Sequence, residues 1–138
     1  MSAPRCLLAL ETSCDETAAA VVAWEGERLV VRSEAVITQD EVHAEYGGVV
    51  PELASRAHLE KLTPAMRGAL SKAGVQPGEL AAVAAGNRPG LIGSLLVGTS
   101  AAKAFAWSFT ARALGLWPGA RLPPASSATC SLPCTCST

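Results

Sequence analysis

The chain has 138 residues, a length that fits one domain or one lobe of a larger protein, and 49% of them are hydrophobic. Its formal net charge of -1 excludes the strongly basic surface with which a protein binds nucleic acid on its own. The five cysteines are odd in number, and the apolar run before Glu11 is too short for a signal peptide. These features exclude a secreted disulfide scaffold, so we expect a cytoplasmic protein with reduced thiols.

Three short strands are predicted at the start of the chain. The apolar runs Cys6–Leu10 and Ala18–Ala23 and the alternating run Leu29–Ile37 have the character of strands. The residues from Trp24 to Glu27 form a natural hairpin turn between the second and third runs. Because the connections are tight, we expect an antiparallel meander.

A helix is predicted to begin at Pro51, since proline suits the first turn of a helix. Apolar residues then follow at helical spacing: Leu59, Leu62, Met66, Ala69 and Ala73. Gly74 is placed to cap the end of this helix. Pro64 interrupts the pattern, and Thr63 before it can cap a new helix, so we expect a kink or two short helices there.

A strand at Leu80–Ala85, a loop and a buried helix complete the predicted order. Small residues recur at every fourth position of that helix and would let its backbone approach a sheet closely: Ser94, Gly98, Ala102 and Ala106. The segment from Leu91 to Phe109 is apolar, but Lys103 and several small polar residues favour a buried helix over a membrane span. The order of elements predicts an α/β fold, a mixed sheet with flanking helices.

The composition changes towards the end of the chain. Trp117–Thr138 contains four prolines, no acidic residue and no regular period. We therefore expect residues 113–138 to be a disordered tail, of the kind that an out-of-frame reading of GC-rich DNA produces. Its cysteines, Cys130, Cys134 and Cys136, lack a fourth ligand, so no zinc site is expected.

Two loops are candidates for binding anions. The turn from Glu11 to Thr17 is either an ordinary polar turn or a site for phosphate or a metal-bound water. Its candidate residues are Thr12, Ser13, Asp15 and Glu16. The second loop leads into the buried helix and is neither a P-loop nor a dinucleotide fingerprint. Its glycines suit an anion, tight turning or close packing, and they are Gly90, Gly93 and Gly98.

Two histidines, His43 and His58, form a third candidate group. If Pro51 opens a helix, Ser55 and His58 share one face of it. The histidines could act as metal ligands or bases. No carboxylate or second histidine stands at ligand spacing, however, and a hydrogen-bonded structural histidine is the commoner case.

Three segments resemble one family, the tRNA threonylcarbamoyladenosine transferases once called O-sialoglycoprotein endopeptidases. In chain order they are Leu8–Thr17 (LALETSCDET), His43–His58 (HAEYGGVVPELASRAH) and Pro89–Gly98 (PGLIGSLLVG). The resemblance runs from about Leu7 to Trp107. It departs from the family pattern at Arg88, which stands before Pro89-Gly90 where the family has Gly-Pro-Gly.

This resemblance implies an actin-like ATPase fold of two lobes, of which residues 6–112 would be the first. It implies transfer of a threonylcarbamoyl group from threonylcarbamoyl-AMP to adenosine 37 of tRNA. It also implies a divalent metal ion of iron or zinc type in the complete protein. In bacteria the implied partners are a paralogous dimerising subunit and an ATPase subunit.

The resemblance also assigns places to residues. Thr12 and Ser13 would form the first phosphate loop, with Asp15 and Glu16 facing the active cleft. Residues near the cleft or the tRNA path would be His43, Tyr46, Glu52, Ser55, Arg56 and His58. The helix with the small-residue face would pack against the paralogous subunit, unless that face packs on the lobe's own sheet.

The family's His-x-x-x-His metal motif has no counterpart, because no histidine follows His58. We therefore expect a truncated or frameshifted first lobe that has no metal site, no cofactor and no transferase activity of its own. The alternative is a noncatalytic interaction module like the family's inactive dimerising paralogue, against which the His43–His58 segment argues. A metalloprotease would require a His-Glu-x-x-His motif, which is absent from the sequence.

Overall fold

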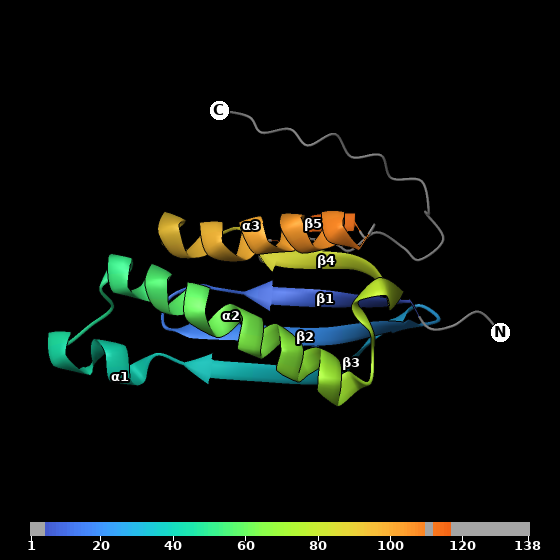
Figure 1. The fold of residues 1–138 in the computed structure, drawn as a ribbon, viewed down its shortest axis with the longest axis horizontal. Coiled ribbons are helices and arrows are strands. Elements are labelled where there is room, and N and C mark those ends of the chain that lie inside the picture. The colour runs from blue at the N-terminus through green and yellow to red at the C-terminus, as the bar shows by residue number, and fades with distance from the viewer. Residues whose placement is uncertain (1–4, 110–111, 117–138) are drawn as a thin grey trace, which may run out of the picture.

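A five-stranded sheet carries two long helices on one of its faces in this computed structural model, which describes residues 5–109 and 112–116 (Figure 1). The strands are β1 (Cys6–Glu11), β2 (Glu16–Glu25), β3 (Arg28–Thr38), β4 (Leu80–Gly86) and β5 (Arg112–Leu116). The α-helices are α1 (Asp40–His43), α2 (Pro51–Ala73) and α3 (Ile92–Ser108). Two short 3-10 helices are η1 (Ala44–Tyr46) and η2 (Pro77–Glu79).

The strands lie in the order β3-β2-β1-β4-β5. β2 pairs antiparallel with both β1 and β3, which confirms the predicted meander. β4 pairs parallel with β1 on one side and with β5 on the other, so the sheet is mixed as expected. Because β1 and β4 run in parallel, their carboxyl ends meet at the same edge of the sheet.

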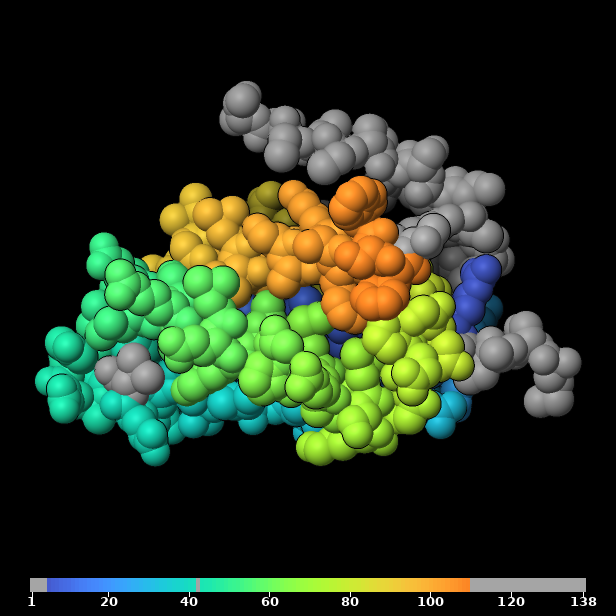
Figure 2. Space-filling view, in the orientation of Figure 1, coloured from blue at the N-terminus to red at the C-terminus, as the bar shows by residue number. Residues whose placement is uncertain are grey.

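Alternation along the strands decides which face of the sheet the helices cover. Leu8 and Leu10 of β1 point to the helix side and form one core with Val21, Leu62 and Val83. α2 and α3 lie side by side over this face, and the space-filling view shows them forming its surface (Figure 2). The opposite face carries a second cluster of buried residues on β1 and β4, made by Leu7, Ala82 and Ala84.

Of the two outcomes predicted at Pro64, a kink or two short helices, the second is wrong, because α2 is one helix from Pro51 to Ala73. Pro64 is exposed, as is Glu60 one turn earlier, so the carbonyl that loses its partner can bond to water. The buried side chains Leu62 and Met66, before and after the proline, hold both halves of the helix against the sheet. The predicted C-cap is confirmed, since Gly74 ends α2 in the left-handed conformation.

The small-residue face of α3 is buried within the chain itself. Its buried residues are Ser94, Gly98, Ala102 and Ala106, which confirms the predicted close approach to the sheet. Of the two uses predicted for this face, the structure shows packing within the lobe itself, which leaves these residues no surface for a partner. Among the helices of the described residues, none has the length and apolar character needed to cross a membrane.

The predicted start of the tail at residue 113 also needs correction. β5 covers Arg112–Leu116 and pairs with β4 from Ala82↔Arg112 to Gly86↔Leu116. Without β5, the backbone groups along this edge of β4 would be unpaired, and β5 forms hydrogen bonds with them. The composition of the segment did not indicate this pairing. The remainder of the predicted tail, residues 117–138, lies outside the described residues.

Candidate functional site

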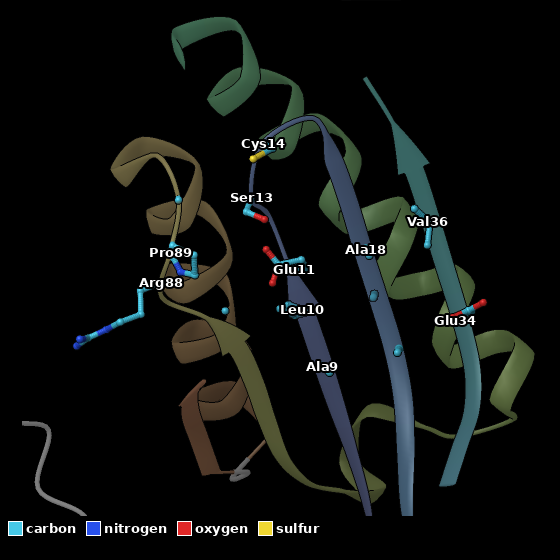
Figure 3. A pocket seen from close by; sticks show the side chains of 14 residues that line it. Ala9, Leu10, Glu11, Ser13, Cys14, Ala18, Glu34, Val36, Arg88 and Pro89 are labelled. Atoms are coloured by element: carbon cyan, nitrogen blue, oxygen red, sulfur yellow. The ribbon is translucent and has the colours of Figure 1, made fainter. Parts of the chain in front are cut away.

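An open pocket of about 660 Å³ lies at the shared end of β1 and β4, on the face of the sheet that α2 and α3 leave free (Figure 3). Its polar rim comes from the end of β1, the turn after it and the loop after β4. Small side chains of β2, such as Ala18 and Ala20, form part of its wall. The rim residues are Glu11, Ser13, Cys14, Gly86, Arg88 and Gly90.

Glu11 and Gly86 are placed together by the parallel pairing of β1 and β4. Alternation along β1 turns Glu11 to the helix-free face, opposite to Leu10. A Cβ atom on Gly86 would collide with the Glu11 carboxylate, so glycine at this position leaves room for it. Figure 3 shows Glu11 and Ser13 at the same end of the pocket, with the side chain of Arg88 extending away from Glu11.

Thr12 is not part of the pocket, because its side chain points to α3 and is buried. Its hydroxyl donates to the carbonyl oxygen of Ser94 at 2.8 Å and accepts from the backbone N–H of Gly98 at 3.1 Å. Ser94 and Gly98 are four residues apart, so the hydroxyl is inserted between two groups that are partners in a regular helix. The hydroxyl is thus not available for a phosphate, and Thr12 instead joins β1 to α3.

The two carboxylates of the turn lie outside the pocket lining. Asp15 is half-buried, and its carbonyl oxygen accepts the backbone N–H of Gln39 at 2.8 Å. Glu16 is exposed and opens β2 opposite Thr38. Of the four residues predicted in this turn, only Ser13 lines the pocket.

The two predicted histidines are buried and meet in one hydrogen-bonded group. His58 Nδ1 lies 2.8 Å from Thr17 Oγ1 and 3.0 Å from Gln39 Nε2. His43 Nε2 lies 3.1 Å from Gln39 Oε1, and His43 Nδ1 accepts the Val50 N–H at 3.5 Å. Burial lowers the pKa of His58, while the backbone of Cys14 and the charge of Glu11 act to raise it. These contacts match the structural alternative, hydrogen-bonded histidines without access to solvent.

The remaining predicted residues do not form one site. Tyr46, Glu52 and Arg56 are exposed around the start of α2. Ser55 donates to the Pro51 carbonyl at 2.9 Å, and its Oγ would lie 2.7 Å from a Cβ on Gly93.

The three predicted glycines have different roles. Gly93 lets α3 approach Ser55 of α2, and Gly98 makes room for Thr12. Gly90 alone lines the pocket, with a φ of +154° that favours glycine. Two of the three glycines therefore serve close packing rather than anion binding.

Comparison with known proteins decides the family. The sequence model of the tRNA N6-adenosine threonylcarbamoyltransferases matches residues 30–116. The chain belongs to this family. The match reaches the end of β5, past the boundary predicted at residue 112.

Relatives in the family share about half or more of the aligned residues. The transferase of Trichlorobacter lovleyi is 60% identical over 100 residues, which cover 72% of this chain and 28% of that protein. The transferase of Desulforapulum autotrophicum is 52% identical over 102 residues, 74% of this chain and 30% of that protein. The chain thus spans less than a third of the length of these relatives.

Solved structures agree on the fold. An uncharacterized Pseudomonas aeruginosa protein with similarity to the peptidase YeaZ superposes with a TM-score of 0.60 at 21% identity. YeaZ from the same organism superposes with a TM-score of 0.58 at 23% identity. Each match covers 81% of this chain and 43% of the other. At this identity the likeness shows the fold alone, and it confirms the expected first lobe of an actin-like ATPase fold.

The divalent metal that the family resemblance implies does not fit the residues described here. Within residues 5–109 and 112–116, no three His, Cys, Asp or Glu side chains gather closely enough to hold an ion. Both ring nitrogens of His43 and the Nδ1 of His58 are already engaged in hydrogen bonds. His43 therefore cannot serve as a ligand without breaking this group, and His58 has only its Nε2 left for one.

Two residues of interest were missed as individual candidates. Glu11 was seen only as the start of the polar turn, although alternation from Leu8 and Leu10 could have placed its side chain on the opposite face. Gln39 had no signal at all. Its side chain joins residues that lie 4 and 19 positions away, a relationship that only the folded chain shows.

Proposed function

We propose that this chain forms the first-lobe wall of a cleft in which a threonylcarbamoyl group passes from threonylcarbamoyl-AMP to adenosine 37 of tRNA. Family membership supports the reaction. The observation that carries the site is the pairing of Glu11 with Gly86 at the joint end of two parallel strands, beside Ser13. Substrates commonly bind outside the carboxyl ends of such strands.

The charge of Glu11 narrows what this wall can contact. A carboxylate accepts hydrogen bonds from hydroxyl and amine groups and repels a phosphate. With the Thr12 hydroxyl committed to α3, the turn offers one free hydroxyl, that of Ser13, to an anion. We therefore assign to this pocket the hydroxyl- and amine-bearing parts of the substrates rather than the phosphate.

In this proposal the chain binds and orients but does not complete the reaction. The divalent ion of iron or zinc type belongs to the complete protein, since the residues described here do not fit it. Fixed charges in a site are often the largest contribution to catalysis. A lobe without the metal site is therefore proposed to be inactive alone. It is proposed to act in the cytoplasm, together with the metal-binding part of the complete protein and the partner subunits.

A partner subunit is part of the same proposal, at a different face of α3 from the one first predicted. Ile92, Leu96 and Trp107 are 79%, 57% and 87% exposed and lie on one side of the helix, where the exposed Lys103 stands between Leu96 and Trp107. We call these three residues the α3 stripe. Its apolar surface suits the paralogous dimerising subunit that the family resemblance implies.

The second candidate is a noncatalytic interaction module. The fold shared with the YeaZ structures and the exposed α3 stripe favour it. It differs from the first candidate in one respect, because a scaffold needs the α3 stripe but not the Glu11 pocket.

A chimera tests the two candidates. The matching segment of the Trichlorobacter lovleyi transferase is replaced by that of this chain, and modified adenosine in tRNA is measured by mass spectrometry with the partner proteins present. We expect the chimera to be active, Glu11→Gln to lower its rate at least tenfold, and the exposed turn variant Glu27→Gln to leave it unchanged.

A folded but inactive chimera that still binds the partner would favour the interaction module. An active chimera in which Glu11→Gln has no effect would remove the pocket from the proposal while keeping the family's reaction.

A further inference from the structure

We propose that Gln39 is a positioning residue: its amide is oriented by His43, whose proton position the Val50 N–H sets, and in turn fixes which nitrogen carries the proton on His58, so that it ties the turn after β1 to the segment before α2. Gln39 is fully buried, between the end of β3 and the start of α1. The proposal concerns this chain's own residues and holds whether or not the transferase proposal does.

The positions of the protons on the two histidine rings can be worked out from a group that can only donate a hydrogen bond. The backbone N–H of Val50 points at His43 Nδ1, at 3.5 Å, so this nitrogen must be the acceptor. A neutral His43 then carries its proton on Nε2 and donates it to Gln39 Oε1 at 3.1 Å. This contact sets the orientation of the Gln39 amide, because a flipped amide would place two donors against each other.

The same amide then decides the state of His58. With Oε1 facing His43, the Nε2 group of Gln39 faces His58 Nδ1 at 3.0 Å and donates to it. Thr17 Oγ1 lies 2.8 Å from the same nitrogen, so Nδ1 is an acceptor approached by two donors. The proton of His58 must therefore be on Nε2.

Gln39 also holds the turn that borders the pocket. Its backbone N–H donates to the carbonyl oxygen of Asp15 at 2.8 Å, two residues after Ser13 in the pocket rim. The same residue therefore contacts both the histidines and the turn. In the described part of the chain, His58 Nε2 is buried and has no hydrogen-bond partner.

Burial is the largest effect on the pKa of His58, which it lowers, and it favours the neutral ring that this order requires. Lys61 and His43 act to lower the pKa of the ring, in the same direction as burial, and Glu11 acts to raise it. Protonating His58 would place an N–H on Nδ1 against the NH₂ group of Gln39. The order therefore requires a neutral ring.

Nitrogen NMR of the full, untagged chain tests the proposal directly, because the sequence contains only two histidines. With ¹⁵N-labelled histidine at pH 7.5, both rings are expected to show a protonated Nε2 and an unprotonated Nδ1. A proton on Nδ1 of either ring in the unchanged chain would overturn the proposal, and this outcome needs no variant.

Gln39→Glu gives the sharper test, since it changes one half of the amide. The oxygen that accepts from His43 is retained, while the group that faced His58 becomes an acceptor. His58 is expected to gain a proton on Nδ1 and titrate at higher pH, His43 to stay as it was, and the amide signals of residues 13–15 to shift. Ser33→Ala, which removes the hydroxyl that donates to Ala69 at 2.6 Å, is the control and is expected to change neither ring.

A folded Gln39→Glu variant with an unchanged His58 spectrum would refute the role of the amide. Unmoved signals at residues 13–15 would refute the tie to the turn.

Discussion

The hydroxyl of Thr12 occupies the space into which a Cβ atom on Gly98 would project. That Cβ would lie 2.5 Å from Thr12 Oγ1, closer than real Cβ contacts come. Thr12 is 1% exposed and is held by two hydrogen bonds to α3, so it cannot move aside. The contact joins the end of β1 to the middle of α3 and determines how close the helix lies to the sheet.

Gly98→Ala is therefore expected to lower the free energy of unfolding by about 1–3 kcal/mol, as overpacking of a core does. This loss runs against helix propensity, which favours alanine over glycine by about 1 kcal/mol. Gly68→Ala in α2 is the matched control, because its Cβ would meet Ala35 at an ordinary 3.5 Å. Urea unfolding is expected to show destabilisation for Gly98→Ala and stabilisation for Gly68→Ala. Two changes of the same sign would contradict the packing argument.

Pro64→Ala is expected to stabilise the protein. α2 continues through Pro64 without the backbone hydrogen bond that proline cannot donate, at a cost of about 3 kcal/mol. Alanine also gives the unfolded chain more freedom, which takes back up to about 1 kcal/mol. The net gain, about 2 kcal/mol, is measured by urea unfolding, with Thr63→Ala at the exposed neighbouring position as control. No gain would mean that Pro64 fits the helix without strain.

The stability of the protein is expected to fall as the pH drops below about 6.5, the ordinary pKa of histidine. Burial lowers the pKa of His58 in the folded state. Below the pKa of His58 in the unfolded chain, the unfolded chain therefore binds a proton that the folded chain does not bind, and this favours unfolding. The contribution of His58 is complete above that pH. It is lost at up to about 1.4 kcal/mol per pH unit until the folded pKa is reached. Unfolding curves between pH 5.5 and 7.5 measure the slope, which His58→Gln is expected to reduce. An equal slope in the variant would assign the acid sensitivity to other groups.

Leu96→Asp is expected to abolish binding to the paralogous subunit while leaving the lobe folded. Leu96 lies in the α3 stripe and is 57% exposed, so a charge there costs the isolated lobe little, within about 0.5 kcal/mol. In an apolar interface the same charge would be desolvated without a partner. Calorimetric titration checks the loss, and Leu29→Asp on β3, at the opposite edge of the sheet, serves as control. Unchanged affinity in a folded Leu96→Asp variant would place the partner elsewhere.

The chain by itself is expected to give no N6-threonylcarbamoyladenosine, even when the partner proteins and Zn²⁺ or Fe²⁺ are added. The described residues gather no group of three metal-holding side chains, and Gln39 already holds His43 Nε2 and His58 Nδ1. Mass spectrometry of tRNA against a no-enzyme control measures the product. Product above that control would show that the transfer needs no metal ligands beyond those present here.

Local patterns were enough to predict four of the five strands and the places of the two long helices, but not α1 or β5. The alternating and apolar runs predicted β1 to β4, since strand residues repeat with a period of two and their neighbours along the chain decide the pattern. Gly74 predicted the end of α2 for a similarly local reason, the left-handed conformation that glycine adopts without cost. The small-residue face of α3 predicted close packing, though not which surface it packs on.

The use of each polar group was decided only by the tertiary structure. The Thr12 hydroxyl reaches partners 82 and 86 residues away, and Glu11 meets Gly86 through strand pairing, so no local pattern distinguishes a phosphate ligand from a structural bond. Pro64 is tolerated because the buried residues on both sides of it hold α2, a gain that helix propensity does not include. Gln39 likewise joins both histidines only because the fold brings their side chains together. A hydrogen bond depends on which groups the fold brings within about 3 Å, and burial then requires that each of them be satisfied.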